Sequence, residues 1–317
     1  MNSLWTVMYH YVRPIKNSRY PNIKGLELDL FKEQLNFFKE HFQVVTMEAV
    51  MEAVEKGTEL PENAMLLTFD DGYRDHYQYV FPLLREFGMQ GSFFVPSAII
   101  REQKVLDVNK IHFILACSEI RELMVRIEEL LEEYRRMGHD IEPTAEIFEK
   151  LAVANRWDPK EVIYVKRLLQ NYLPEELRHI IVDRLFVEIV GCSEEEFSKE
   201  LYVDMDMIRE MKKAGMHFGL HGDAHYWLNK LTREELEKDL RKSLSFFEDV
   251  MEPEKLTINY PYGGYNDDVI ACAKAMGCKL GFTVEARKAV LFEEDALTLP
   301  RFDTNDFPPK SDHWRKL

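Results

Sequence analysis

Short apolar runs alternate with amphipathic helical patterns near both ends of this 317-residue chain. In the first part, the apolar runs 4–9, 63–69 and 91–96 are separated by helical patterns at 27–42 and 74–87. An alternation of this kind indicates a parallel sheet with its helices on the outside. It resumes in the last third of the chain, with strand-like runs at 217–222, 256–262, 279–284 and 297–302 and helical patterns at 204–214, 232–251 and 266–277.

The alternation is interrupted between residues 101 and 203, where almost no strand pattern occurs and several helical patterns follow one another. The clearest of them runs from Ile120 to Gly138, with apolar residues at helical spacing and a glycine at its end. We therefore expect residues 1–103 and 204–317 to build one barrel. Residues 104–203 are expected to form an all-helical insertion, which could cap a pocket or provide the surface of a homo-oligomer.

The charge balance is 41 Lys+Arg against 56 Asp+Glu, which gives a net charge of -15. This balance argues against nucleic-acid binding through a broad basic surface. The four cysteines have no CxxC spacing, so buried thiols are expected rather than disulfides. The first residues lack a basic start and a long apolar run, and no stretch approaches the ~20 apolar residues that span a bilayer. We expect a cytoplasmic protein without a membrane span.

Two adjacent carboxylates, Asp70 and Asp71, follow the apolar run 66–69 directly. In a pocket, both can stay charged only beside a positive group such as a metal ion or an arginine. Gly72 lets the chain leave the strand, so both side chains can point into one pocket. The alternative is that the two aspartates only cap a helix that begins near Arg74.

The segment GLHGDAH ends another predicted strand and carries His221 and His225. In a barrel of parallel strands, the carboxyl ends of the strands form the face that carries the chemistry. Neutral imidazole is the commonest metal ligand, although an HxxxH pair alone is also frequent by coincidence. One aspartate and two histidines would make a three-ligand site with an open position for water, as in catalytic zinc sites. The other aspartate could then act as a base on that water.

A third segment, NYPYGGYN at 259–266, also ends a predicted strand. Pro261 fixes the backbone, and the two glycines that follow allow the close approach of a substrate. A backbone N–H group, most simply that of Tyr262, could stabilise an oxyanion. As a bare pattern the segment is a turn, and its functional meaning depends on the other two motifs.

Together the three motifs resemble the polysaccharide deacetylase family, also called the NodB-homology or carbohydrate esterase 4 family. The matching segments are TFDDG at 68–72, HGDAH at 221–225 and PYG at 261–263. The resemblance implies an α/β fold, a distorted (β/α) barrel that usually has seven strands. It also implies a divalent metal, typically Zn²⁺, on Asp71, His221 and His225, with Asp70 as the general base.

Two departures from the family pattern concern the groups around the base. Most members have an arginine two residues before the proline of the third motif, where this chain has Asn259. Arg301, at the end of the run LTLPRF, could supply that cation, or it could be an ordinary surface arginine. The late leucine-x-x-histidine motif, which supplies the family's general acid, is missing.

A permuted branch of the family has an early Tyr-His pair on its first strand, and MYHYV at 8–12 fits that pattern. The resemblance then implies that His10 protonates the departing amine, a role that suits the near-neutral pKa of imidazole. The alternative is a core or surface histidine, and His313 is a second candidate for the acid. Four aromatic residues near the motifs could stack on a sugar ring or only pack, with Tyr73 favoured by its position: Tyr73, Tyr226, Trp227 and Tyr265.

These expectations combine into a metal-dependent hydrolase that removes an N-acetyl group from a carbohydrate substrate. The absence of an export signal and the large insertion favour a nucleotide-linked or lipid-linked precursor of a surface polysaccharide. Two alternatives stay open: an amidohydrolase that acts on a non-sugar amide, and a non-catalytic sugar-binding protein on the same fold.

Overall fold

The structure is a computed structural model that describes residues 2–155 and 158–316, and the chain forms two compact units. The first unit consists of Met1–Pro14, Gly25–Lys104 and Ser198–Leu317, and the second of Ile15–Lys24 and Val105–Phe197. The short segment Ile15–Lys24 thus belongs to the helical unit, although the sequence pattern had placed it with the barrel.

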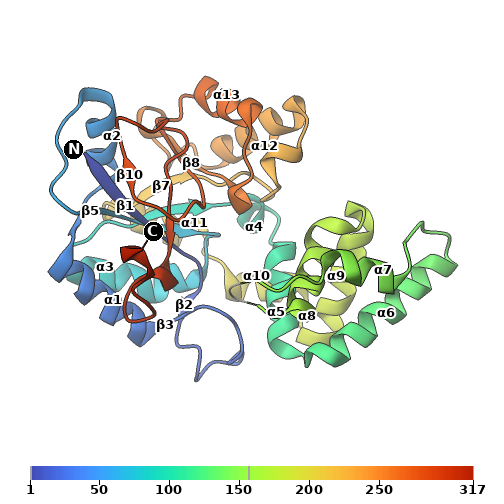
Figure 1. Ribbon diagram of the computed structural model, residues 1–317. Helices are drawn as coiled ribbons and strands as arrows, with labels where there is room; N and C mark the ends of the chain where they lie inside the picture. Colours follow the sequence, from blue (N-terminus) through green and yellow to red (C-terminus); the bar gives the residue numbers. More distant parts are fainter. Residues whose placement is uncertain (1, 156–157, 317) are drawn as a thin grey trace. The chain divides into compact units, whose positions relative to one another are not determined.

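Seven parallel strands of the described residues curl into a distorted barrel in the first unit (Figure 1). In the order of their hydrogen bonding they are β1 (Ser3–Tyr9), β5 (Ala64–Asp70), β6 (Ser92–Val95), β7 (His217–Leu220), β8 (Thr257–Asn259), β9 (Leu280–Phe282) and β11 (Phe302–Asp303). Strand β11 pairs with β1, and Leu299 just before it forms a parallel bridge to Phe282 of β9. The segment 299–303 therefore joins the two ends of the sheet, and the predicted α/β barrel is confirmed.

Shorter strands extend this sheet at its margins. Strand β10 (Ala289–Val290) runs antiparallel to β1, β4 (Gln43–Val44) lies parallel beside β5, and β2 (Val12–Arg13) pairs separately with β3 (Leu26–Glu27). Every residue of β5 is buried. Because both faces of a parallel strand are covered, β5 appears in the sequence as a continuous apolar run and not as an alternating one.

Helices surround the strands of the first unit (Figure 1): α1 (Leu28–His41), α2 (Met47–Lys56), α3 (Phe81–Phe87), α4 (Ala98–Arg101), α11 (Met205–Lys213), α12 (Arg233–Phe246) and α13 (Asp267–Ala275). Helix α1 buries Phe31, Leu35 and Phe38, the apolar stripe of the predicted helix 27–42. Helix α2 was missed in the sequence, although it is capped by Thr46 and ends at Gly57 in the left-handed conformation. Helix α12 ends at Phe246, five residues before the predicted end.

The second unit is built from helices: α5 (Asp107–Cys117), α6 (Ile120–Arg136), α7 (Thr144–Leu151), α8 (Lys160–Arg167), α9 (Glu175–Val190) and the start of α10 (Glu194–Leu201). Helix α6 matches the predicted amphipathic helix and buries its apolar stripe. Cys272 and Cys278 are buried as expected, whereas Cys117 is exposed and Cys192 is only partly buried. In the described part of the chain, no helix is both long and apolar enough to cross a bilayer.

Candidate active site

Asp70 and Asp71 lie at the carboxyl end of β5, where the chain turns sharply. Asp70 is the last residue of the strand, and the next two residues are both in the left-handed region, with φ of 71° at Asp71 and 69° at Gly72. A Cβ atom on Gly72 would lie 2.6 Å from Cγ1 of Val95, so glycine is required there. The helical residues that follow begin at Arg74, but the two aspartate side chains face Arg301 and the histidines and do not cap that helix. A non-glycine residue held in this region is a feature of functional sites.

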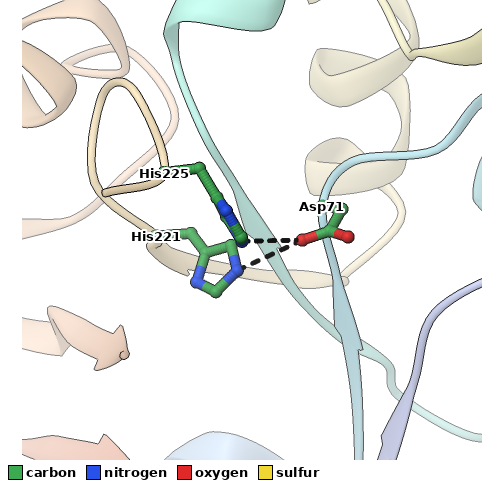
Figure 2. A group of neighbouring side chains, drawn as sticks. All are labelled: Asp71, His221 and His225. Atoms are coloured by element: carbon green, nitrogen blue, oxygen red, sulfur yellow. Dashed lines mark ion pairs between the residues drawn. The ribbon is translucent and has the colours of Figure 1, made fainter. Parts of the chain in front are cut away.

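Asp71 converges with His221 and His225, which come from the loop after β7 (Figure 2). Oδ1 of Asp71 lies 3.3 Å from Nε2 of His221 and 3.2 Å from Nε2 of His225. All three side chains are buried, and one ligand atom from each lies within 4.8 Å of the others. The two motifs therefore meet at one point, as their positions at strand ends predicted.

The hydrogen bond that His221 makes indicates which of its ring nitrogens carries a proton. Nδ1 of His221 lies 2.9 Å from the carbonyl oxygen of Asn259. A carbonyl only accepts, so Nδ1 of His221 carries a proton, and with no second proton on the ring Nε2 would present a lone pair to Asp71. Within the described residues, Oδ1 of Asp71 and Nδ1 of His225 are buried without a hydrogen-bond partner. A divalent cation among the three side chains would remove the conflict between lone pairs, and this donor set is one that zinc accepts.

The charges at this point of the site favour a bound cation. Burial acts to raise the pKa of Asp71, but positive charge and N–H donors on the facing imidazoles of His225 and His221 outweigh it and hold that pKa well below its ordinary value. Burial lowers the pKa of His225 despite the nearby carboxylate, so a neutral His225 does not supply that positive charge. A metal ion would supply it, and an ionised aspartate beside a neutral histidine is the state that binds a metal.

The second oxygen of Asp71 is held by Tyr73. The Tyr73 hydroxyl donates to Oδ2 of Asp71 at 2.5 Å, and its ring stacks on Tyr11 with the centroids 4.1 Å apart. This contact turns Oδ1 of the carboxylate toward the two histidines. Tyr73 is fully buried, so the expectation that its ring stacks on a sugar is wrong. Tyr11 was not identified in the sequence, because its contact depends on how β1 and β5 pair.

Asp70 forms a two-pronged ion pair with Arg301. Nη1 of Arg301 lies 3.0 Å from Oδ1 and Nη2 lies 3.0 Å from Oδ2 of Asp70. Nη2 also donates to Oδ1 of Asn259 at 2.9 Å, so the arginine contacts the position where the family usually has one. Arg301 is 1% exposed, which excludes an ordinary surface arginine. Burial acts to raise the pKa of Asp70, but Arg301, helped by His10, outweighs it and lowers that pKa.

His10 lies on the exposed side of this ion pair. Its Nε2 is 3.8 Å from Oδ2 of Asp70, and 44% of its side chain is exposed. This distance is too long for a direct hydrogen bond. The alternative acid, His313, faces Asp306 at 3.8 Å. Of the two candidates for the acid, His10 is thus the one that lies beside Asp70, and its side chain is partly exposed.

The third motif also reaches the site. Tyr262 follows β8 in a short turn and has a positive φ of 59°. Its ring stacks on Trp227, with the centroids 4.6 Å apart and the planes at 9°, and meets His225 edge-on at 4.6 Å. Both rings of the stack are half-buried, and Tyr226 is 39% exposed. Tyr265 packs instead on a buried tyrosine at the end of β8.

The family model described as polysaccharide deacetylase matches residues 57–152 and 188–281, more than half of the chain. The chain belongs to the polysaccharide deacetylase family. The buried triad of Asp71, His221 and His225 is typical of the metal site of this family. His10 and Arg301 lie outside the matched residues, so their assignment depends on the geometry alone.

Three curated relatives carry deacetylase names. A Bacillus subtilis protein named as a polysaccharide deacetylase is 18% identical over 280 residues, which cover 88% of this chain and 63% of the relative. The poly-β-1,6-N-acetyl-D-glucosamine N-deacetylase of Staphylococcus aureus is 29% identical over 158 residues, 47% of this chain and 52% of the relative. The Escherichia coli enzyme of the same name is 44% identical over 88 residues, 27% of this chain and 13% of the relative. The chain therefore spans less than two thirds of the length of these relatives.

Solved structures with the same fold cover almost the whole chain. The deacetylase PplD of Streptococcus pyogenes, in complex with acetate, superposes with a TM-score of 0.60 at 16% identity, over 98% of this chain and 95% of that one. IcaB from Ammonifex degensii gives a TM-score of 0.56 at 17% identity, over 100% of this chain and 98% of that one. These likenesses establish the fold.

Proposed function

We propose that the protein is a metal-dependent hydrolase that removes the N-acetyl group from an N-acetylated sugar. The observation that carries the proposal is the buried cluster in which one oxygen of Asp71 faces the Nε2 atoms of His221 and His225, beside a second carboxylate that is paired with an arginine. Two of the relatives are named as N-deacetylases of poly-β-1,6-N-acetyl-D-glucosamine, which supports a sugar amide as the substrate.

Asp71, His221 and His225 would hold the divalent cation, for which we propose Zn²⁺. When bound, such a cation polarises the amide carbonyl and lowers the pKa of a water molecule to near neutral. The hydrogen bonds from His221 to the Asn259 carbonyl and from Tyr73 to Asp71 keep the ligand atoms turned toward that position.

Asp70 would act as the general base. It stays ionised because Arg301 lowers its pKa, and each of its oxygens keeps a lone pair beyond the one that the guanidinium occupies. The oxygen of water attacks the carbonyl carbon while Asp70 takes the proton. The backbone N–H of Tyr262, in the turn beside His225, would stabilise the negative charge that develops on the carbonyl oxygen.

His10 would act as the general acid. It transfers a proton to the amide nitrogen as the carbon–nitrogen bond breaks, and the products are acetate and the free amine. Its position at the end of β1, on the exposed side of Asp70, supports this role. The same position supports placing the chain in the permuted branch of the family, which has a Tyr-His pair on the first strand.

For the sugar carrier, we propose a nucleotide-linked or lipid-linked precursor of a surface polysaccharide. Acetate release should be measured with nucleotide N-acetyl sugars, with a lipid-linked N-acetyl sugar, with β-1,6-linked N-acetylglucosamine oligomers and with chitin oligomers. Activity on the oligomers alone would overturn the precursor proposal while leaving N-deacetylation in place.

The base assignment is tested with Asp70→Asn, and Asp75→Asn serves as the matched control. Asp75 is also a buried, arginine-paired carboxylate, but its partner is Arg13 and it lies outside the cluster. Asp70→Asn should bind as much metal as the parent and lose about 10²-fold or more in acetate release, whereas Asp75→Asn, if folded, should keep its activity. Normal turnover by Asp70→Asn would refute the assignment. Hydrolysis of a cyclic amide without acetate release would favour the non-sugar alternative.

A further inference from the structure

The loop between the two histidines has an unusual backbone. Gly222 has a φ of 71° and His225 a φ of 57°, so left-handed residues stand at both ends of the segment 222–225. Left-handed backbone at a non-glycine residue persists only when its surroundings hold it in place. The direction of the His225 side chain therefore depends on groups that fix this loop.

The carboxylate of Asp239 on helix α12 accepts hydrogen bonds from two backbone N–H groups of the loop. Oδ2 of Asp239 accepts the N–H of Asp223 at 2.9 Å, and Oδ1 accepts the N–H of Ala224 at 3.2 Å. Asp239 is buried, and a Cβ atom on Gly222 would lie 2.8 Å from its Oδ2. Successive N–H groups that point at one anion form a compact anion-binding turn. Here the anion is a side chain of the protein itself.

Other contacts also hold the loop, and they act on different atoms. The side chain of Asp223 accepts from Ser97 at 2.5 Å and pairs with Arg101 and Lys242, while its carbonyl accepts from the N–H of Ala98 at 2.9 Å. These contacts fix Asp223 but leave the two N–H groups of the loop to Asp239. Asp239 thus has a separate role from the polar cluster around Asp223.

We propose that Asp239 is a positioning residue of the metal site, which sets the metal affinity by fixing the loop that carries His221 and His225. The inference rests on the metal site proposed above. Groups that orient metal ligands without touching the metal change affinity by about 10–100-fold when they are replaced.

The test compares the Zn²⁺ affinity of the parent, Asp239→Asn and Leu236→Ala, measured by competition with a chromophoric chelator. The side chain of asparagine has nearly the same size as that of aspartate, but only its oxygen accepts a hydrogen bond. In Asp239→Asn the NH₂ group would face the second backbone N–H, so one of the two hydrogen bonds is lost. Leu236 is buried one turn earlier on the same helix and contributes only packing. We expect Asp239→Asn to bind Zn²⁺ about 10–100-fold more weakly than the parent, and Leu236→Ala to bind it as tightly as the parent.

A second variant, Gly222→Ala, approaches the same contact from the loop, since its methyl group would push against the Asp239 carboxylate. It should weaken Zn²⁺ binding by about 10–100-fold as well. If Asp239→Asn does not fold, the Zn²⁺ affinity of Gly222→Ala tests the positioning role of Asp239. If the parent binds Zn²⁺ and a folded Asp239→Asn binds it with the same affinity, the positioning role of Asp239 is wrong and the proposed metal site still stands. A parent that binds no Zn²⁺ would overturn both this inference and the proposed metal site.

Discussion

Replacing Arg301 by methionine tests the arrangement around the catalytic base most severely. The guanidinium is 1% exposed and makes hydrogen bonds of 2.9–3.0 Å to the Asp70 carboxylate, the Thr68 hydroxyl, the Asn259 amide oxygen and the Thr283 carbonyl. Methionine has a similar length and no charge, so Arg301→Met removes these contacts without opening a large cavity. Asp70, which is 2% exposed, then becomes a buried carboxylate without its cation.

The size of the expected loss in unfolding free energy follows from the burial of both Asp70 and Arg301. Removing one partner of a buried ion pair costs about 3–5 kcal/mol, because the remaining charge is left uncompensated. Removing both charges costs much less, since neither group then needs a partner. We therefore expect Arg301→Met to lower the free energy of unfolding by about 3–5 kcal/mol, and the double variant Asp70→Asn/Arg301→Met to recover a large part of that loss.

The assay is urea unfolding of the metal-free parent, both single variants and the double variant, followed by tryptophan fluorescence. Trp5, Trp227 and Trp314 all lie in the barrel unit and report on its unfolding. The four free energies form a double-mutant cycle for the pair. An Arg301→Met loss below about 1 kcal/mol, or strictly additive effects in the double variant, would show that Asp70 and Arg301 do not form a buried pair.

Two further predictions use groups at other distances from the metal ligands. Tyr73→Phe removes only the hydroxyl that donates to Asp71, so its Zn²⁺ affinity should fall about 10–100-fold while its melting temperature changes little, and equal affinity would contradict the orienting role. Burial lowers the pKa of His76 and of His217 to about 4, from 6.5 in an unfolded chain. Between pH 6.5 and pH 4 the unfolded state therefore binds more protons than the folded state. The stability that each neutral ring contributes is fully present above pH 6.5 and is lost as the pH falls toward 4. At pH 5 the loss in the free energy of unfolding is about 2 kcal/mol per ring. Urea unfolding of metal-free His217→Gln at pH 7.5 and pH 5 should show a smaller loss than the parent, and identical losses would refute the assignment for that ring.

Much of the site was predictable because its parts lie at the ends of strands. Apolar runs that are followed by aspartate, histidine or a proline-glycine turn indicated where β5, β7 and β8 end. In a parallel barrel the carboxyl ends of the strands lie on one face. Convergence of Asp71 with His221 and His225 follows from this rule without knowledge of the individual contacts. The same rule brings Tyr262 beside His225.

Two contacts depend on pairing over long distances: the sequence left the role of Arg301 open between two alternatives and gave no sign of the place of Ile15–Lys24. The bond between Arg301 and Asp70 joins residues 231 positions apart, and it exists because the segment 299–303 closes the barrel between β9 and β1. Ile15–Lys24 has no helical pattern, yet it belongs to the helical unit, where Tyr20 packs on Phe113. Neither contact leaves a local periodicity that a sequence could show.

We propose that Asp71, His221 and His225 bind one divalent cation. The most direct measurement is elemental mass spectrometry of the parent and of His221→Ala, each after dialysis against Zn²⁺ and removal of the free metal. We expect about one Zn²⁺ per chain in the parent, as a three-ligand site requires, and little in a folded His221→Ala. Absence of stoichiometric metal from the parent, or equal metal in both proteins, would show that these three residues do not form a metal site.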